Sequence, residues 1–388
     1  MKVLSFSYCF PNHANPIWGV FVQQRLAAMT ARVELQVASP VPSFPVVSRF
    51  RASPGPETET WQGLAVHRPR FLCFPGVLKS QDARLYARGL RGWFDRFVQT
   101  WRPDVLDAHF VWPDGVGVSL LARRAGLPYS ITLRGKIYPC LEVPSQKRQC
   151  AEALCGASAV ISVSSPMAEI ARELGVRADR LHVILNGVDI ERFCPRDRAA
   201  ARRELGLPVE GRLIVTVAHL GPRKGHRETI QALAELPEDV RLVIVGGDPD
   251  NGHNERALRE LAAEKGLSKR VVFAGQQDYD RVPRYFNAAD VSVLASYREG
   301  CPNTVLESLA SGVPVVASAV GAVPDMIDDG RNGRIVTVRQ VGPLRDALAE
   351  SLGKTWSPSE VRASRAVRTW AQVADEVLAV LGAACGAG

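Results

Sequence analysis

The stretch REGCPNTVLESLASGVPVVAS, residues 298–318, decides the fold class. Gly300 and Pro302 interrupt the preceding strand, and a proline at this point predicts a helix that starts near residue 302. The apolar run 313–317 after the helix predicts a buried strand. A strand, a loop, a helix and a second strand in succession are typical of an α/β domain with a parallel sheet.

The start of this helix predicts an anion site. The backbone amides of Asn303, Thr304 and Val305 have no acceptor inside a helix that begins at 302, so they point out of its first turn. The loop at Gly300 and Pro302 leads directly into that turn. We therefore expect this segment to bind a diphosphate.

Two glutamates bracket the predicted phosphate pocket. Glu299 lies in the loop before the helix and can reach hydroxyl groups of a substituent beyond the diphosphate. Glu307 lies more than one turn along the helix and can accept hydrogen bonds from a ribose. In the alternative interpretation, Glu299 only interacts with the helix dipole and Glu307 is a solvated helix position.

Short apolar runs alternate with helical patterns along the whole chain, which predicts parallel sheets covered by helices. The predicted strands lie near residues 2–7, 33–38, 104–108, 128–133, 159–163, 212–218, 240–245, 270–274, 291–295 and 313–317. Ligands of such sheets bind beyond the carboxyl ends of the strands. The expected ligand loops are 8–19, 109–115, 134–138, 219–225, 246–253 and 296–303.

A chain of 388 residues with 46% apolar residues is long enough for two domains, each with its own core. The turn signal Asn186-Gly187 and the later Pro195 place the domain boundary in the linker around residues 186–195. The predicted parts are an N-terminal domain over 1–186, a second domain over 187–357 and a C-terminal helix over 358–388.

Together these motifs resemble those of the retaining glycosyltransferases of family 4, whose GT-B architecture has two facing Rossmann-like α/β domains and a deep interdomain cleft. The resemblance covers nearly the whole chain. Besides Glu299 and Glu307, it is carried by NPIWGVFVQQRLAAM (15–29), DVLDAHFVWPDG (104–115), VILNGVDIERFCP (183–195), LIVTVAHLGPRKGH (213–226), LVIVGGDPD (242–250), RVVFAGQQ (270–277) and AADVSVLAS (288–296). It implies that a nucleotide-sugar binds in the cleft and that the C-terminal helix returns to the first domain.

The resemblance also implies roles for further residues. Lys224 and Arg223, in GPRKG after a strand, would stabilise the departing diphosphate, although such a pair is also common in solvated loops. Gly19 resembles the glycine of a first-domain loop that faces the donor phosphate, with an ordinary turn as the alternative. Gln276 is also assigned to the donor site.

The chain departs from the family pattern at three places. Ala218-His219-Leu220 stands where the family has Gly-Arg-Leu, so either a protonated His219 or Arg223 would replace the usual phosphate-binding arginine. Arg134, in LRGKIYP, stands where many members have histidine, and we expect it to contact the donor or the acceptor. The run 321–325 lacks a second glycine and a glutamate, a difference that we regard as minor.

His109, at the carboxyl end of a predicted strand, is a candidate to touch the donor sugar or to take a proton from the acceptor. A buried structural histidine is the alternative. Asp114 in the same loop is a weaker candidate for acceptor binding, because Pro113-Asp114-Gly115 also spells an ordinary turn.

The formal net charge of +8 lies entirely in the first half of the chain: residues 1–190 contain 22 Lys and Arg against 14 Asp and Glu, whereas 191–388 contain 26 of each. A basic first domain suits an anionic acceptor, such as a lipid diphosphate, or the anionic surface of a membrane. Residues 79–102 predict an arginine-rich helix that either lies on a membrane or packs its aromatic side on the first sheet. We expect no nucleic-acid partner, because no nucleic-acid module accompanies the charge.

No apolar run reaches the roughly 18 residues of a membrane span, and residues 1–10 read as a strand, so we expect a cytoplasmic protein, at most peripheral on the inner face of the membrane. The eight cysteines form no CxxC pairs, which indicates neither a zinc site nor a disulfide framework. The acidic pairs in 248–250 and 278–280 only superficially resemble a metal-binding motif. We expect no metal and no cofactor.

The resulting hypothesis is a retaining hexosyltransferase that moves a sugar from a UDP- or GDP-sugar to a lipid-linked or polysaccharide acceptor in cell-envelope or exopolysaccharide biosynthesis. The alternatives are a nucleotide-sugar epimerase of the same architecture and a non-catalytic sugar-nucleotide-binding subunit. An NAD-dependent oxidoreductase is disfavoured, because no Gly-x-Gly-x-x-Gly run follows a strand.

Overall fold

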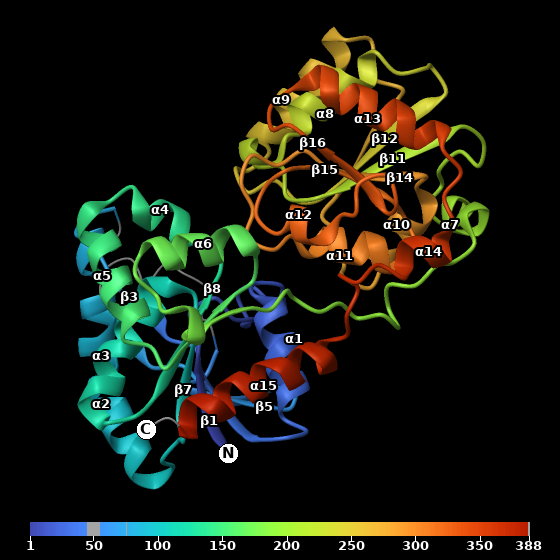
Figure 1. The fold of residues 1–388 in the computed structure, drawn as a ribbon. Helices are drawn as coiled ribbons and strands as arrows, with labels where there is room; N and C mark the ends of the chain where they lie inside the picture. The colour runs from blue at the N-terminus through green and yellow to red at the C-terminus, as the bar shows by residue number, and fades with distance from the viewer. Residues whose placement is uncertain (45–54, 75, 387–388) are drawn as a thin grey trace. The chain divides into compact units, whose positions relative to one another are not determined.

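The computed structural model describes residues 1–44, 55–74 and 76–386, and the chain forms two compact units (Figure 1). Unit 1 contains Met1–Asn186 and the C-terminal helix from Trp370, and unit 2 contains Gly187–Thr369. Each unit is built around a mainly parallel sheet with helices on its faces. The predicted α/β class with two Rossmann-like domains is therefore confirmed.

The sheet of unit 1 has the strand order β10-β9-β8-β7-β1-β2-β5-β4, with parallel neighbours except for the antiparallel pair β4 and β5. Its strands are β1 (Lys2–Phe6), β2 (Glu34–Ala38), β4 (Thr58–Trp61), β5 (Leu64–His67), β7 (Val105–His109), β8 (Tyr129–Leu133), β9 (Ala159–Ser162) and β10 (Leu181–Val183). A separate two-stranded sheet pairs β3 (Val41–Ser43) with β6 (Arg70–Leu72).

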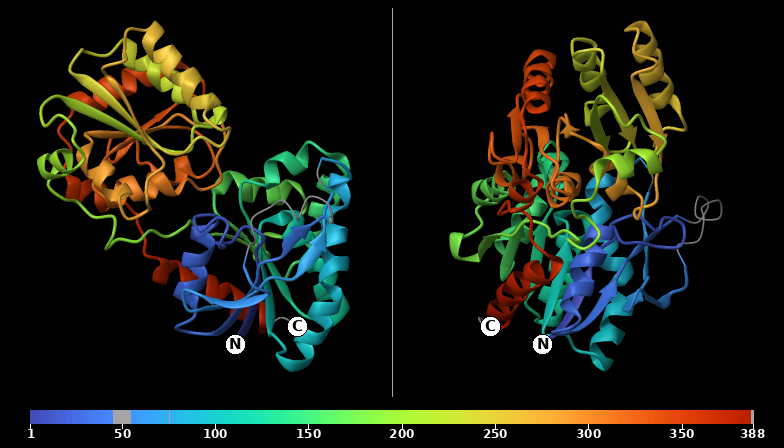
Figure 2. Two further views of the ribbon diagram at one scale, coloured as in Figure 1. Left: turned by 180° about the vertical axis from the view of Figure 1, so that it is seen from behind. Right: turned by 90° about the vertical axis from the view of Figure 1, so that its right-hand side faces the viewer.

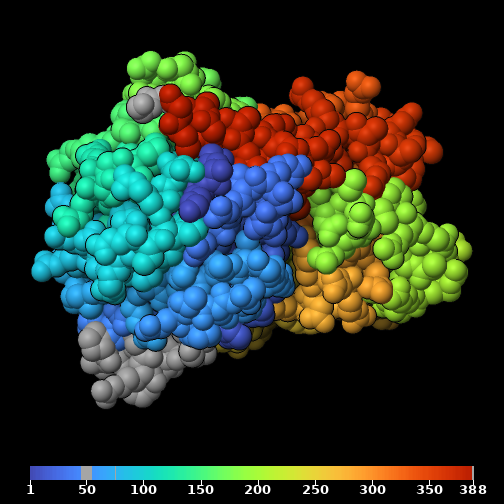
Figure 3. Space-filling view, turned by 90° about the horizontal axis from the view of Figure 1, so that it is seen from below, coloured from blue at the N-terminus to red at the C-terminus, as the bar shows by residue number. Residues whose placement is uncertain are grey.

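The helices of unit 1 are α1 (Val20–Met29), α2 (Asp82–Thr100), α3 (Val116–Ala125), α4 (Ile137–Leu141), α5 (Pro144–Cys155), α6 (Ser165–Glu173) and α15 (Trp370–Gly386). Helices α1 and α15 lie side by side on one face of the sheet and bury Val22, Leu26, Val373 and Val377 there (Figures 1 and 2). The space-filling view in Figure 3 shows α15 on the surface beside the N-terminal residues. The first and last segments of the chain thus share one core.

Helix α2 packs its aromatic side on the opposite face of this sheet. The ring of Phe6 lies 6.4 Å from that of Trp93 and 6.3 Å from that of Phe94, measured between centroids. The arginines of α2, including Arg84 and Arg88, are exposed. Of the two interpretations of residues 79–102, packing on the sheet is therefore the one observed.

The sheet of unit 2 has the order β13-β12-β11-β14-β15-β16, and all neighbours are parallel. Its strands are β11 (Arg212–Val217), β12 (Val240–Val245), β13 (Val271–Gly275), β14 (Val291–Leu294), β15 (Val315–Ser318) and β16 (Gly333–Val336). Its helices are α7 (Arg198–Glu204), α8 (His226–Ala234), α9 (His253–Glu264), α10 (Val282–Ala288), α11 (Asn303–Ala310), α12 (Val323–Met326), α13 (Val341–Gly353) and α14 (Pro358–Arg362). Helices α8, α9 and α13 bury Ile230, Leu258 and Leu348 against one face (Figure 2).

The C-terminal helix was predicted over 358–388, and its predicted first residue is wrong, because the helix that packs in unit 1 begins at Trp370. Residues 358–369 stay with unit 2, where Ser357 caps α14 by accepting a hydrogen bond from the Glu360 amide. The Arg362 guanidinium donates hydrogen bonds to carbonyl oxygens of unit 2, among them Phe193 and Ile190, each at 2.8 Å. Only from Trp370 onward does the chain pack in unit 1.

All ten predicted strands are present, with ends that differ by at most a few residues. Within the described residues six further strands were not predicted, namely β3, β4, β5, β6, β10 and β16. Each of them has only three or four residues. The equally short β9, β14 and β15 were predicted because every residue in them is buried, whereas the six unpredicted strands contain partly exposed positions and give a weaker apolar signal.

A close approach at Gly225 joins the loops that follow β11 and β14. Gly225 has a φ of +71°, and a Cβ atom at this position would lie 2.0 Å from the carbonyl oxygen of Ala295. Only glycine fits such a contact, since a side chain would meet both a strained backbone and a rigid carbonyl. This contact fixes the distance between the two loops.

We predict that Gly225→Ala destabilises unit 2 by more than the roughly 1–2 kcal/mol that a left-handed conformation costs an L-residue. Gly206→Ala is the matched control, because Gly206 has a similar φ of +66° but no atom within 4 Å of the added Cβ. Urea and thermal denaturation of both variants measure the difference. Equal losses of stability would show that the contact with Ala295 does not matter.

Candidate functional site

The predicted ligand loops of unit 2 meet at the carboxyl edge of its sheet. Because β11, β12, β14 and β15 run parallel, the loops after them leave the sheet on the same side. Hydrogen bonds join neighbouring loops: the Leu220 amide donates to the Gly247 carbonyl at 2.9 Å, and the Tyr297 amide donates to the Arg223 carbonyl at 2.8 Å. These loops therefore form one connected layer.

Lys224 and Glu299 form an ion pair in this layer. The Lys224 Nζ atom lies 2.6 Å from the Glu299 Oε1 atom, and each side chain is 13% exposed. Lys224 comes from the short helix η5 (Pro222–Lys224), and Glu299 comes from the loop before α11. The sequence predicted both residues separately, and the structure brings them together. Arg223 beside them is exposed, and within the described residues its guanidinium has no ion-pair partner.

The start of α11 differs slightly from the prediction. Pro302 lies just before the helix in an extended conformation, and Asn303 is the first helical residue. The Val305 amide donates to the Pro302 carbonyl at 3.1 Å. The predicted set of three outward amides is therefore wrong in including Val305. The Thr304 amide makes no backbone hydrogen bond within the described part of the chain.

The loop before α11 is held from the other side by the run 321–325. The Ala322 amide donates to the Gly300 carbonyl at 2.8 Å. The sequence suggested that departures in this run are minor. In the structure the run positions the loop that carries Glu299.

Glu307 is buried on α11, so its interpretation as a solvated helix position is wrong. The Tyr279 hydroxyl donates a hydrogen bond to its Oε1 atom at 3.0 Å. The Arg192 guanidinium lies over the Tyr279 ring, 4.8 Å from its centroid. Burial raises the pKa of Glu307 to about 7, while Tyr279 and Arg192 act in the opposite direction. A carboxylate held at the border of ionisation is a feature of functional sites.

The surroundings of His219 favour its neutral form. Burial, together with the charges of Lys224 and Arg223, lowers the pKa of His219 below its ordinary value. Its Nδ1 atom accepts a hydrogen bond from the Gly221 amide at 3.0 Å, so the ring proton resides on Nε2. These contacts favour a neutral His219, so of the two predicted replacements for the usual arginine Arg223 is the one that carries a charge, and its phosphate role stays a prediction. Gln276, which follows β13, packs against Gly247.

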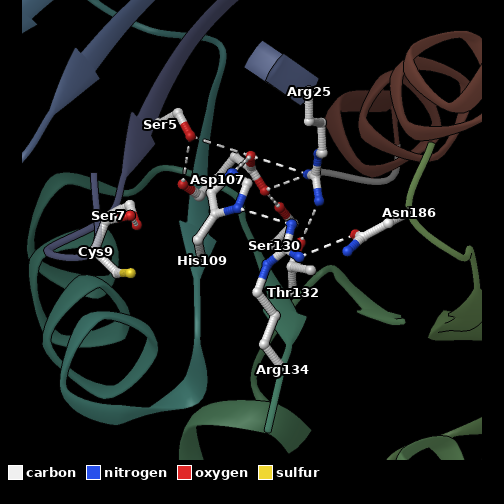
Figure 4. Close-up of polar contacts among 10 residues, drawn as sticks. All are labelled: Ser5, Ser7, Cys9, Arg25, Asp107, His109, Ser130, Thr132, Arg134 and Asn186. Atoms are coloured by element: carbon white, nitrogen blue, oxygen red, sulfur yellow. Dashed lines mark hydrogen bonds and ion pairs between the residues drawn. The ribbon is translucent and has the colours of Figure 1, made fainter. Parts of the chain in front are cut away.

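Unit 1 contains a second polar cluster, centred on the buried Asp107 of β7 (Figure 4). Asp107 forms an ion pair with Arg25 of α1 at 3.1 Å and accepts hydrogen bonds from Ser130 at 2.8 Å and Ser5 at 3.2 Å. Arg25 also donates to the Thr132 hydroxyl at 2.9 Å. Burial alone would raise the pKa of Asp107, but the charges of Arg25 and His109 outweigh this effect and lower it.

Arg25 and Asp107 were missed as individual residues, although both lie in quoted stretches. The sequence did contain a signal for this pair. Asp107 lies within an otherwise apolar strand (VLDAH), and Arg25 lies on the apolar side of a helix. Two such residues are rarely buried unless they pair. The sequence therefore contained a hint of this ion pair.

His109 lies inside unit 1. Its ring is fully buried, with Nε2 at 3.1 Å from Asp107 Oδ2 and Nδ1 at 3.4 Å from the Arg134 guanidinium. Burial and the charge of Arg25 lower the pKa of His109 to about 4. This burial favours the alternative of a structural histidine, and the catalytic role of His109 stays a prediction.

Arg134 is also part of this protein network. It is buried and donates a hydrogen bond to the Asn186 side chain at 3.0 Å (Figure 4). Its guanidinium also lies over the Phe21 ring, 4.8 Å from the centroid. These contacts join the end of β8 to α1 and to Asn186, the last residue of the first segment of unit 1. The predicted contact of Arg134 with the donor or acceptor stays a prediction.

Gly19 serves a close approach within unit 1. With a φ of +76°, a Cβ atom at Gly19 would lie 2.2 Å from the Cys9 carbonyl oxygen. Its conformation is thus explained by chain packing, as in the alternative of an ordinary turn. Asp114 is similarly structural: it accepts hydrogen bonds from the Tyr8 amide at 3.0 Å and the Tyr86 hydroxyl at 2.9 Å, and burial raises its pKa to about 7.

A pocket of about 320 Å³ opens at the carboxyl edge of the sheet of unit 1. It is lined by Tyr8, Pro42, Phe71, Cys73, Lys79, Asp82, Trp112, Pro113, Lys136, Pro139, Cys140 and Gln146. Lys79 is paired with Asp82 at 3.2 Å, whereas within the described residues the Lys136 ammonium has no ion-pair partner. Leu72, Val77 and Leu78 are neighbours of the lining residues in the chain and are 40–59% exposed. The pocket thus combines aromatic walls, cations and an exposed apolar border.

Among residues 1–44, 55–74 and 76–386, no group of three or more His, Cys, Asp or Glu side chains is arranged to hold a metal ion. In the predicted acidic pair 248–250, Asp248 instead accepts hydrogen bonds from the Glu255 amide and the Asn254 side chain, at 2.8 and 2.9 Å. No helix in this part of the chain is both long and apolar enough to span a bilayer.

Known families match both units. The family model "Glycosyltransferase Family 4" matches residues 24–192, and "Glycosyl transferases group 1" matches residues 197–369. The chain is 30% identical over 341 residues to the proposed teichuronic acid biosynthesis glycosyltransferase TuaC of Bacillus subtilis, covering 84% of this chain and 83% of that one. A D-inositol 3-phosphate glycosyltransferase of Mycobacterium bovis is 36% identical over 212 residues, which are 53% of this chain and 44% of that protein.

Solved structures agree on the fold. The sucrose-phosphate synthase of Thermosynechococcus elongatus superimposes with a TM-score of 0.81 at 21% identity over the whole of both chains. HepE of Anabaena, solved in complex with UDP, superimposes with a TM-score of 0.77 at 20% identity, over 98% of this chain and 100% of that one. Given the relative from Bacillus and the two family models, the chain belongs to the family 4 (group 1) glycosyltransferases and has their GT-B fold.

Proposed function

We propose that the protein is a retaining, metal-independent hexosyltransferase that moves a sugar from a UDP- or GDP-sugar to a lipid-linked or polysaccharide acceptor during assembly of an envelope polysaccharide. The observation that carries this proposal is the Lys224–Glu299 ion pair beside the start of α11. HepE binds UDP and UDP-glucose, which supports a nucleotide-sugar donor. The Bacillus relative is assigned to teichuronic acid biosynthesis, which supports a polysaccharide pathway.

In the proposed donor site, Lys224 and Arg223 bind the diphosphate. The ion pair with Glu299 holds the Lys224 ammonium at the edge of the sheet before the donor arrives. A diphosphate brings two negative charges, so it competes with Glu299 for Lys224. Glu299 is then released to accept hydrogen bonds from the sugar hydroxyls. The neutral His219 and the Thr304 amide supply further donors.

Glu307 is the proposed ribose ligand. An ionised carboxylate accepts hydrogen bonds from two neighbouring hydroxyls, and the Tyr279 hydroxyl uses only one of its acceptor positions. Burial keeps water from competing for the others. Ribose binding therefore favours the charged form of Glu307.

Transfer with retention places the acceptor hydroxyl on the same side of the sugar as the departing diphosphate. The diphosphate oxygen accepts the proton of that hydroxyl as the new glycosidic bond forms and the old bond breaks. The developing negative charge on the diphosphate is stabilised by the two cations of the loop 223–224 and by the start of α11. In this proposal these groups stabilise the charge of the diphosphate that a metal ion stabilises in other glycosyltransferases.

The proposed acceptor site is the pocket of unit 1. The Lys136 ammonium suits a phosphate, while the aromatic walls and the exposed Leu72, Val77 and Leu78 suit a hydrocarbon chain. A lipid phosphate combines both properties. The same exposed side chains would bring the protein to an anionic membrane as a peripheral partner.

We predict that Lys224→Ala lowers kcat by about 100-fold or more, the usual effect of removing one group that stabilises transition-state charge. KM for the donor changes less, because the interaction strengthens as the bond breaks. Donor turnover with product analysis measures both. Lys265→Ala, an exposed lysine of the same unit, is the control. Donor binding without any turnover by the native protein would favour the non-catalytic subunit, and an epimerised donor without acceptor would favour the epimerase.

We predict that the affinity for UDP-glucose rises as the pH increases from about 5 to about 7 and then levels off. The reason is that the pKa of Glu307 is about 7 in the free protein and that the ribose requires its ionised form. The doubly esterified diphosphate of the donor keeps its charge over this range. Calorimetric titrations should show this dependence in the native protein and a flat, weaker profile in Glu307→Gln. A pH dependence that persists in the variant would contradict the assignment.

We predict that Lys136→Ala lowers kcat/KM for a polyprenyl-phosphate-linked acceptor by about 10- to 100-fold, as expected for the loss of a charged hydrogen bond worth roughly 1.5–3 kcal/mol. Lys147→Ala is the matched control, since Lys147 is an exposed lysine of the same unit outside the pocket. Transfer assays with the lipid acceptor measure the effect. Equal rates for the two variants would exclude this pocket as the phosphate site.

A further inference from the structure

Two adjoining pockets lie at the edge of the sheet of unit 2 that is opposite to the donor loops. Their lining includes residues directly before β14, β15 and β16, namely Asp290, Pro314 and Asn332. The donor loops follow the carboxyl ends of β11, β12, β14 and β15, at the other edge of the same parallel sheet. No residue of the proposed transferase site lines either pocket.

The pockets have volumes of about 310 and 540 Å³ and share a wall made of Lys354, Thr355 and Trp356. This wall connects α13 to α14 (Figure 1). The Trp356 Nε1 atom donates to the Ser351 carbonyl at 2.8 Å, and the Lys354 ammonium lies 4.3 Å from the centre of the indole ring. The volumes lie within the roughly 300–1,000 Å³ typical of small-molecule sites.

The lining of each pocket contains a guanidinium group that forms no ion pair within the described residues. Arg196 lines the first pocket and Arg331 lines the second, and within the described residues neither side chain has a hydrogen-bond or ion-pair partner. By contrast, Arg198 is paired with Asp290 and Arg365 with Asp328 in the same pockets. Together the linings contain five cationic side chains and three carboxylates. After these two pairs, Arg196, Lys354 and Arg331 remain with one carboxylate, Glu360, so the two linings together carry a net charge of +2.

A buried hydroxyl also lines the first pocket. Ser351 on α13 is 1% exposed, and its Oγ atom has no hydrogen-bond partner within the described residues. A hydroxyl in a helix usually bonds to the carbonyl one turn earlier or to water. Leaving it unpaired in a buried position costs free energy, which a ligand oxygen at this point would recover.

From these features we propose that the two pockets bind an acidic oligosaccharide, with one uronate carboxylate on Arg196 and another on Arg331. Guanidinium groups bind carboxylates through two parallel hydrogen bonds. The indole of Trp356 offers a flat apolar surface for a sugar ring between the two charges, and Ser351 offers a hydroxyl for a ring oxygen or hydroxyl. The inference rests on the proposed function in one respect: an enzyme that assembles a polysaccharide has such a polymer as its substrate or product. The site would bind the growing polymer away from the transfer site.

Binding of size-defined oligouronates to the full chain tests this proposal. Calorimetry at low salt should show binding of an oligouronate but not of a neutral gluco-oligosaccharide of the same length, and added salt should weaken it. In Arg196→Gln/Arg331→Gln the dissociation constant should rise at least about tenfold, which corresponds to roughly 1.4 kcal/mol. Both positions are exposed, so the variant is expected to fold. Arg256→Gln, which changes an exposed arginine of α9, is the matched control and should bind as the native protein does.

Equal binding of acidic and neutral oligosaccharides, no binding of either, or unchanged binding by the double variant would each overturn the proposal. Thermal stabilisation by UDP-glucose is recorded in parallel, and the double variant should retain it. If the donor stabilises the protein while oligouronates do not bind, this inference alone fails. If oligouronates bind at Arg196 and Arg331 while no donor binds, the acidic-glycan site stands and the proposed transferase function fails.

Discussion

The parallel direction of β11, β12, β14 and β15 is the constraint on which the candidate donor site depends. Parallel strands end at the same edge, so loops that are far apart in the sequence leave the sheet together. Lys224 and Glu299 are 75 positions apart and meet at 2.6 Å for this reason. The contact of Gly225 with the Ala295 carbonyl then sets how closely these loops can approach.

The two units contain ion pairs of different character. Arg25 and Asp107 are almost fully buried, and the hydroxyl groups of Ser5, Ser130 and Thr132 add hydrogen bonds to the pair. Removing one partner of such a pair leaves an uncompensated buried charge, at a cost of roughly 3–5 kcal/mol. Lys224 and Glu299 retain some exposure at the edge of their sheet. A charged ligand can reach the second pair and not the first, so the first serves the fold and the second suits binding.

Much of the fold could be predicted because long apolar runs such as 240–245 indicate buried parallel strands whatever their neighbours are. The short strands could not be predicted, since β16 depends on pairing with β15 more than on its own composition. The candidate site shows the same division. Lys224 and Glu299 were singled out from their motifs. Arg25 and Asp107 lie in recognised stretches, but their ion pair could be identified only in the folded structure. His109 was singled out for its position at a strand end, and its burial could not be predicted because it depends on packing against other parts of unit 1.

The sequence by itself determined the α/β class, ten of the strands and the residues of the loops 219–225 and 296–303, because these follow from local composition and chain direction. The tertiary structure decided which of these residues face ligands and which face the protein. Burial and partners are properties of three-dimensional packing: they make Glu307 a carboxylate near its point of ionisation, favour the neutral form of His219, and enclose His109 and Arg134 in the core of unit 1. Only the folded chain also places Arg196, Trp356 and Arg331 around two adjoining pockets, since these residues come from three different connections of unit 2.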